Sequence, residues 1–324
     1  ARKAAAALIA NAEGLSMAAL ENLPLPDATM KKIDLVNEAL LFYTEHTTGY
    51  SESVREPYSL QTMEQRALKE SYAWEANRRS ASLGEDVLGL LQSKFTGEKD
   101  PSLIVFNTLN WPRSGPVTVY IDHQIVPRGK MPLVYDFKGN SFPAQALSSR
   151  SDGTYWQIWV KDIPAYGYRK YLVRLADEQE PDNSMTTGTV LENQWYKITV
   201  DPLKGTVKSL YDKELSLELV DQKAQYGMAE FILEKLGNRS QMESKKLDDF
   251  VRLPLDTIWF DSMNHGPVFS TIRFFGESET AEAPRGFAID IRLFNTEKKI
   301  EVQCSIVKKS IVSPEGIYIA FPFD

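Results

Sequence analysis

Hydrophobic and polar residues follow two different patterns along this chain, one before about residue 97 and one after residue 100. In the first part, apolar side chains recur every three or four residues, which is the spacing of one face of a helix. In the second part, they alternate with polar side chains, as on the two faces of a strand. The change predicts helices over residues 4–92 and an almost wholly β region over residues 101–324.

Three helices are predicted in the first part. Asp27 is a candidate N-cap for the second helix, and Gly49 is its natural end. Thr62 and Gln65 form a capping box for the third. The predicted apolar stripes of the first two helices are Leu8, Ala12, Leu15 and Ala19, then Ile33, Val36, Leu40 and Tyr43. In the third, a seven-residue repeat predicts the seam that packs on the other two: Ala67, Trp74, Ala81 and Leu88.

Short β-rich runs separated by turn residues follow the change near Gly97. The first series comprises Leu103–Leu109, Pro116–Ile121, Tyr155–Ile163 and Tyr168–Arg174. After a polar linker at residues 175–188, the second comprises Gln194–Asp201, Thr206–Tyr211, Val268–Phe275, Ala288–Phe294, Ile300–Val307 and Gly316–Phe323. Strands do not alternate with helices, so a parallel α/β sheet is not expected. The predicted domains are a three-helix bundle (1–96), a small β-sandwich (97–185) and a large β-sandwich (186–324).

Composition narrows the classes of function. The 324 residues carry a net charge of −7, which disfavours nucleic acid and anionic membranes as partners. A single cysteine, Cys304, excludes an internal disulfide and a cysteine-based zinc site, and its strand-like surroundings predict a buried thiol. The first residues, from Ala1 to Lys3, include no initiator Met and no signal-peptide pattern. We therefore expect a piece of a longer protein, and localisation cannot be inferred.

The three histidines do not form a metal motif by themselves. His46, His123 and His265 are each isolated, whereas zinc sites need several donors that converge. Isolated histidines are more often structural than ligating. His46 has the best context because it follows the second helix, in line with its apolar stripe. No pair of carboxylates, nucleophile elbow or phosphate loop can be identified either, so the residues alone define no complete active site.

Four stretches, in this order, resemble the middle and C-terminal parts of glycoside hydrolase family 38, the zinc-dependent retaining α-mannosidases. They are Glu45-His46-Thr47-Thr48-Gly49, Asn107-Thr108-Leu109-Asn110-Trp111-Pro112-Arg113, residues 193–213 (beginning Asn193-Gln194-Trp195-Tyr196) and Glu315-Gly316-Ile317-Tyr318-Ile319-Ala320-Phe321-Pro322-Phe323. The resemblance extends over some 300 residues. It implies an α+β multidomain fold: a three-helix bundle followed by β-sandwich domains of the galactose-mutarotase-like supersandwich type.

The resemblance also implies a function for the longer protein. In the family, zinc binds the sugar, one Asp is the nucleophile and another is the acid/base. Those groups lie in an N-terminal β/α domain that is not in this sequence, so no catalytic residue is expected here. The helical domain supplies one zinc ligand, which corresponds to His46. The family has a second His before this position and an Asp after it, where this chain has Glu45 and Thr47. We expect this piece to be inactive alone, with an α-mannoside and the catalytic domain as its partners.

Two other interpretations remain open. In one, the chain is a carbohydrate-binding module in which Trp111, Trp156, Trp159 and Trp195 stack on sugars. In the other, it is a structural β scaffold with no affinity for sugars. Aromatic residues at alternating strand positions usually belong to a core. A binding module would need two or more exposed tryptophans, coplanar in one groove, so their positions distinguish these interpretations.

Overall fold

The computed structural model describes residues 2–45, 51–53, 55–95, 100–177 and 188–324. The chain forms two compact units. The first unit comprises Ala1–Ser114, Tyr135–Asn140 and Val160–Arg174. The second comprises Gly115–Val134, Ser141–Trp159 and Leu175–Asp324. The boundaries expected at 96/97 and 185/186 stay predictions.

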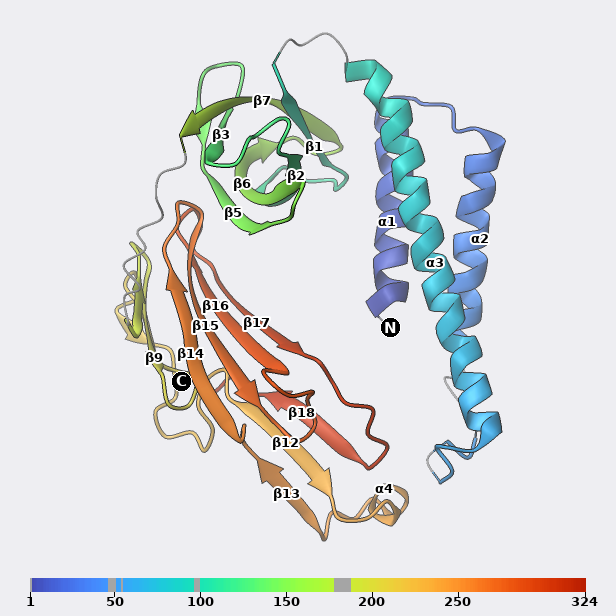
Figure 1. The fold of residues 1–324 in the computed structure, drawn as a ribbon, viewed down its shortest axis with the longest axis vertical. Helices are drawn as coiled ribbons and strands as arrows, with labels where there is room; N and C mark the ends of the chain where they lie inside the picture. Colours follow the sequence, from blue (N-terminus) through green and yellow to red (C-terminus); the bar gives the residue numbers. More distant parts are fainter. Residues whose placement is uncertain (1, 46–50, 54, 96–99, 178–187) are drawn as a thin grey trace. The chain divides into compact units, whose positions relative to one another are not determined.

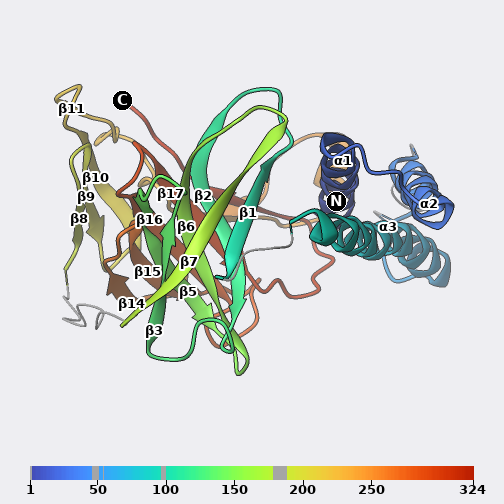
Figure 2. The same cartoon turned by 90° about the horizontal axis from the view of Figure 1, so that it is seen from above.

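Three helices make up most of the first unit, as the periodicity predicts, and they lie side by side (Figures 1 and 2). They are α1 (Arg2–Leu20), α2 (Asp27–Thr44) and α3 (Leu60–Gln92), and the short 3-10 helix Ser93–Phe95 follows α3. None of the described helices combines the length and the apolar character that crossing a membrane would need. A partly exposed ion pair joins α2 to α3, because Lys32 Nζ donates to Asp86 Oδ2 at 2.6 Å.

The start of α3 differs from the capping box expected at Thr62. Ser59 is the N-cap, and its Oγ accepts from the backbone N–H of Thr62 at 3.3 Å. Thr62 already lies in the first turn, where it is buried and donates through Oγ1 to the carbonyl of Glu56. The predicted capping box therefore begins three residues too late. Thr62 is a residue type that can cap a helix, but here its backbone N–H donates to the N-cap residue, Ser59.

The predicted buried stripes of α1 and α3 are wrong. On α1, Leu8, Ala12, Leu15 and Ala19 are all exposed. On α3, Ala67, Trp74, Ala81 and Leu88 are exposed too. The helices pack instead through other side chains: Ala4, Ala7, Asn11, Gly14 and Ala18 on α1, and Ala73, Ala76, Ser80, Leu83, Val87 and Leu91 on α3. Small residues on α1 let the backbones of α1 and α3 approach closely. The packed face of α1 is therefore the one with the smaller side chains, and the face with Leu8 and Leu15 is exposed.

The stripe predicted for α2 is confirmed. Ile33 and Val36 are buried, and Leu40 packs against the cluster formed by Ala7, Val36, Ala39 and Ala76. At the start of the stripe, Ile33 packs with Leu83, Val87 and Leu91 in a second cluster. The helix that leads to His46 is thus held by a packed face along most of its length.

Seven strands follow the helices. They are β1 (Ser102–Asn107), β2 (Arg113–Asp122), β3 (Lys130–Tyr135), β4 (Ser141–Phe142), β5 (Ala144–Ser149), β6 (Gly153–Ile163) and β7 (Gly167–Asp177). In the first unit, β1 pairs with β7 in antiparallel register, with Ser102 opposite Leu172 and Asn107 opposite Gly167. In the second unit, β5 pairs with β6. All four strands predicted for this region are confirmed, whereas β3, β4 and β5 carry no clear alternation.

The remaining strands belong to the second unit and form three antiparallel sheets (Figure 1). The first is β8 (Val190–Glu192), β9 (Tyr196–Asp201), β10 (Thr206–Asp212) and β11 (Leu217–Glu218). The second is β12 (Phe231–Leu236), β13 (Phe250–Leu253) and β18 (Glu315–Ile319). The third is β14 (Thr257–Asn264), β15 (Phe269–Glu277), β16 (Phe287–Phe294) and β17 (Ile300–Ile306), in that order across the sheet. The helix α4 (Ser240–Ser244) lies between β12 and β13.

One hydrophobic core joins these sheets. It receives Ile198 and Val200 from β9, Leu233 from β12, Ile272 from β15 and Ile291 from β16, all at most 2% exposed. The inward residues of β15 and β16 occupy every second position, as the predicted alternation requires. In the part of the second unit after Leu175 that the structure describes, α4 is the only α-helix. The predicted α+β fold, with helices first and packed antiparallel sheets after, is confirmed.

Candidate functional site

His46, the predicted metal ligand, lies outside the described residues. The structure does describe the residue before it, Glu45, which follows the last turn of α2. Lys69 of α3 binds this helix end: its Nζ donates to the carbonyl of Phe42 at 2.9 Å and to Glu45 Oε2 at 2.8 Å. A cation at a helix C-terminus offsets the partial negative charge of the free carbonyls.

The same helix end is also held by an aromatic contact. The rings of Phe42 and Tyr72 stack with 5.3 Å between centroids. The Lys69 side chain is 12% exposed and that of Glu45 is 42% exposed, so the ion pair is only partly shielded from water. The backbone that enters the His46 segment is therefore fixed from two sides by α3. No sequence pattern predicts the role of Lys69, which is 24 residues from Glu45.

The other two histidines have structural partners. His123 lies in a turn, and its Nε2 is 3.1 Å from Thr154 Oγ1. His265 Nδ1 is 3.1 Å from Ser270 Oγ. Among the described residues, no group of three or more His, Cys, Asp or Glu side chains could hold a metal ion. Cys304 is exposed, which corrects the expectation of a buried thiol; it lies on β17, the last strand of its sheet.

The tryptophans that a sugar-binding module would need do not form an exposed group. Trp111 is 54% exposed, but Trp156 is buried, and Trp159 and Trp195 are partly buried. One exposed ring cannot provide the pair of coplanar platforms that the binding-module interpretation requires. The positions of these four residues therefore favour the scaffold interpretation over the binding module.

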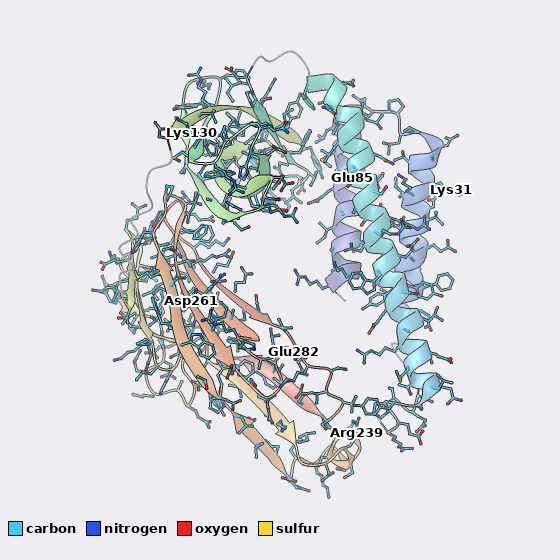
Figure 3. The ribbon with its side chains drawn as sticks, viewed as in Figure 1. Lys31, Glu85, Lys130, Arg239, Asp261 and Glu282 are labelled. Atoms are coloured by element: carbon cyan, nitrogen blue, oxygen red, sulfur yellow. The ribbon has the colours of Figure 1, made fainter. Side chains whose placement is uncertain are left out.

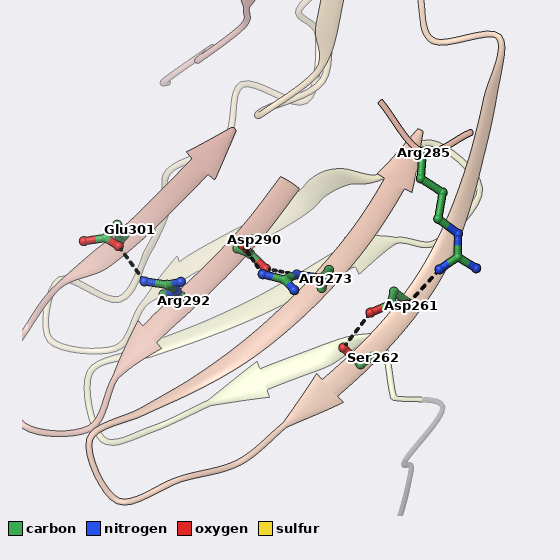
Figure 4. Close-up of polar contacts among 7 residues, drawn as sticks. All are labelled: Asp261, Ser262, Arg273, Arg285, Asp290, Arg292 and Glu301. Atoms are coloured by element: carbon green, nitrogen blue, oxygen red, sulfur yellow. Dashed lines mark hydrogen bonds and ion pairs between the residues drawn. The ribbon is translucent and has the colours of Figure 1, made fainter. Parts of the chain in front are cut away.

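The outer face of the β14–β17 sheet carries a set of polar contacts between charged side chains (Figure 4). Arg273 forms a two-pronged pair with Asp290, at 2.6 Å from Nε and 2.8 Å from Nη2. This hydrogen-bonded pairing raises the pKa of the Arg273 guanidinium. On the same face, two residues after Asp290 in β16, Arg292 pairs with Glu301 of β17 at 3.2 Å.

A β-bulge adds a third ion pair to this face. The register of β14 shifts between Phe260 and Ser262, which places Asp261 at the irregularity. Asp261 then accepts from Ser262 Oγ and lies 3.9 Å from Arg285 (Figure 4). Each of the three pairs joins one cation to one anion, so this face has donors and acceptors but little net charge.

A hollow of about 190 Å³ lies at one end of the β14–β17 sheet. Its lining includes Asp256, Glu277, Glu279, Glu282 and Lys309, of which Glu282 can be seen in Figure 3. Glu279 pairs with Lys235 at 2.8 Å, outside the lining. These carboxylates do not form a group that could hold a metal ion. Among the described residues, the hollow therefore adds no metal centre.

Two asparagines from the motifs that carry the family resemblance have structural roles. Asn107 is buried, and its Nδ2 donates to the carbonyls of Trp111 and Pro164 at 2.7 and 3.0 Å. Asn193 Oδ1 accepts from two backbone N–H groups, and its Nδ2 donates to the carbonyl of Phe294 at 2.7 Å. Both side chains bind backbone groups in loops and at the ends of strands. These motifs therefore identify the fold rather than a site of chemistry.

The architecture is that of glycosyl hydrolase family 38 proteins of known structure, over the part of those proteins that this chain matches. Two of them come from Enterococcus faecalis. One is described as a protein in the glycosyl hydrolase family 38, and the other as an alpha-mannosidase from strain V583. Each superimposes with a TM-score of 0.56 at 11% sequence identity.

The match covers 97% of this chain but only 44% and 42% of the two solved chains. This chain therefore spans less than half the length of the proteins whose fold it shares. No family model and no curated protein matches the sequence. At this identity the likeness shows the fold, and what the chain does is a separate question.

Proposed function

We propose that this chain is the helical and β part of a glycoside hydrolase of the family 38 type, which cleaves terminal α-mannosides with retention and uses zinc. The observation that carries the proposal is the shared fold over 97% of the chain with proteins described as belonging to that family and as an alpha-mannosidase. The four motif stretches support it, because they occur in the order expected for that family.

In this proposal, His46 is one zinc ligand and the catalytic carboxylates come from a further domain. One imidazole provides one of the four donors that a zinc site commonly uses. Among the described residues, no group of three or more His, Cys, Asp or Glu side chains could hold a metal ion. The 324-residue chain alone is proposed to be inactive, because the catalytic carboxylates would come from the further domain. The fixed end of α2 supports this role, since Lys69 and Tyr72 hold the backbone from which the ligand would project.

The test is a His46→Ala substitution in the longer protein encoded by the gene. Zinc content by elemental analysis and turnover of an aryl α-mannoside should both fall at least roughly tenfold, because losing a ligand should exceed the ~10–100-fold cost of losing a supporting partner. His123→Ala is the matched control, since His123 has its own partner in Thr154. Unchanged zinc content in the His46 variant would exclude the ligand role.

The alternative is a non-catalytic β module, and the partly buried tryptophans favour a scaffold within that class. The two proposals differ in what the 324-residue chain binds. A sugar-binding module should bind mannose oligosaccharides by calorimetry and lose that binding on Trp111→Ala. The proposal above expects no heat of binding from the chain alone, and a robust heat would favour the module.

A further inference from the structure

The side chain of Gln145 reaches from one β-sheet to the start of a strand in another. Its Oε1 accepts from the backbone N–H groups of Val268 and Phe269, at 3.1 and 3.0 Å. Gln145 lies on β5, the last strand of the β2–β6–β5 sheet, and Phe269 begins β15 of the β14–β17 sheet. All three residues belong to the second unit. Among the described residues, no ladder pairs a strand of one sheet with a strand of the other, so this side chain provides hydrogen bonds that the two backbones do not.

The two N–H groups form a small concave site for one oxygen atom. Successive backbone N–H groups that converge on a point bind an electronegative atom, which here is the amide oxygen of Gln145. The site is buried, since Val268 is 0% exposed and Phe269 5%, and both pack with Phe294. A buried N–H group without a partner carries its full desolvation penalty. This cradle therefore requires an acceptor, and Gln145 supplies it.

The loop that forms the cradle is also fixed by its own sheet. The Nδ2 of Asn295 donates to the carbonyl of Gly266 at 2.8 Å, and the backbone N–H of Asn295 donates to the carbonyl of Val268 at 2.9 Å. The Nδ1 of His265 lies 3.1 Å from Ser270 Oγ. None of these contacts involves β5, so the shape of the cradle is set independently of the strand that fills it.

Gly266 provides the space for the Gln145 side chain. A Cβ at position 266 would lie 2.2 Å from Cδ, 2.3 Å from Oε1 and 2.4 Å from Nε2 of Gln145. The amide group therefore occupies the volume that a side chain at position 266 would need. These atoms are the free end of a flexible side chain, so a methyl group at position 266 would displace the amide rather than the backbone. Gly266→Ala thus breaks the contact without changing Gln145.

We propose that Gln145 is a conformational latch. With its amide in the cradle, β5 is fixed on the β14–β17 sheet, and with the amide withdrawn, β5 and that sheet move independently. Release needs only a change of side-chain rotamer, because the cradle keeps its own contacts and β5 keeps its pairing with β6. The proposal does not depend on the function proposed above.

The distance between two spin labels, measured by electron paramagnetic resonance, tests the latch. One label is attached to Cys304, the single cysteine, which is exposed on β17, and the other to a cysteine introduced by Ser148→Cys at an exposed position of β5. The latched chain should give one narrow distribution of distances, and Gln145→Ala and Gly266→Ala should each broaden it. Gln145→Glu is the matched control, because a carboxylate oxygen accepts the same two hydrogen bonds, and it should keep the distribution narrow.

Amide hydrogen exchange at Val268 and Phe269 tests whether both substitutions break the same contact. Gln145→Ala and Gly266→Ala should each accelerate exchange at these two amides at least ~10-fold, because each N–H group loses its partner. The double substitution should add no further acceleration, since no amide is left for the methyl group to displace.

Two results would overturn the proposal. A distribution that stays narrow in Gln145→Ala, even with faster exchange, would mean that β5 is held in place without the latch. Accelerations that add in the double variant would mean that Gly266→Ala acts on the loop itself rather than on Gln145.

Discussion

Gly14 lies in the middle of α1 and packs on α3, so Gly14→Ala tests the close approach of the two helices. A Cβ at this position would lie 3.5 Å from Leu83 Cδ2, 3.5 Å from Leu83 Cγ and 3.9 Å from Val87 Cγ2. These are ordinary van der Waals distances, so the methyl group fits without moving a neighbour. Two favourable effects then add: about 1 kcal/mol from helix propensity and about 0.8 kcal/mol from one buried methyl group. We expect a gain in unfolding free energy of about 1 to 2 kcal/mol.

Urea unfolding followed by circular dichroism at the helical band measures this gain. Gly89→Ala on α3 is the matched control, because a Cβ there meets nothing within 4 Å. The control should show the propensity effect alone, and the difference between the two variants isolates the packing contribution. A loss of stability in Gly14→Ala, with the expected gain in Gly89→Ala, would mean that α1 and α3 lie closer together than the structure has them.

Two further predictions concern the polar anchors. Asn107→Ala removes the donor to two loop carbonyls and the acceptor for Leu109 N–H, and should cost about 2 to 3 kcal/mol in urea unfolding, whereas the exposed Asn110→Ala should be neutral. Lys298 pairs with Asp212 at 2.9 Å, and this hydrogen bond lowers the pKa of Asp212 below its usual 3.8. A lowered folded-state pKa adds stability that is present above the unfolded pKa and lost as pH falls through the folded pKa. Lys298→Met should therefore move acid unfolding to higher pH in a fluorescence titration, and an unchanged midpoint would contradict the assignment.

The sequence predicted the type and order of elements well because each region has a strong period. Strand β15 shows why: Ile272 and Phe274 point into the core and Arg273 points out, so composition follows geometry at every position. Strand β5 shows the limit. Its last four residues, two apolar and two polar, are all exposed, so no alternation marks it. Such a strand is defined by its pairing with β6, a tertiary contact that a local pattern cannot contain.

The candidate site was less predictable than the fold. The sequence predicted that the second helix continues through His46 and ends at Gly49, whereas α2 ends at Thr44, two residues before His46. It could not identify Lys69, because an ion pair between two helices depends on how they pack. The motif asparagines show the opposite case. Asn107 and Asn193 were visible in the sequence, yet their hydrogen bonds assign them to loop structure.

The α3 stripe shows how a correct period can predict the wrong partner. A 33-residue helix has room for more than one apolar face. The face used inside the unit follows spacings of three and four residues, from Ala73 through Ala76, Ser80 and Leu83 to Val87. The strict seven-residue repeat lies beside it and includes the largest side chain, Trp74. Burial inside one chain selects the face that meets the small residues of α1, and this leaves the heptad face exposed. A strict repeat in the sequence therefore does not by itself mark the face that the bundle buries.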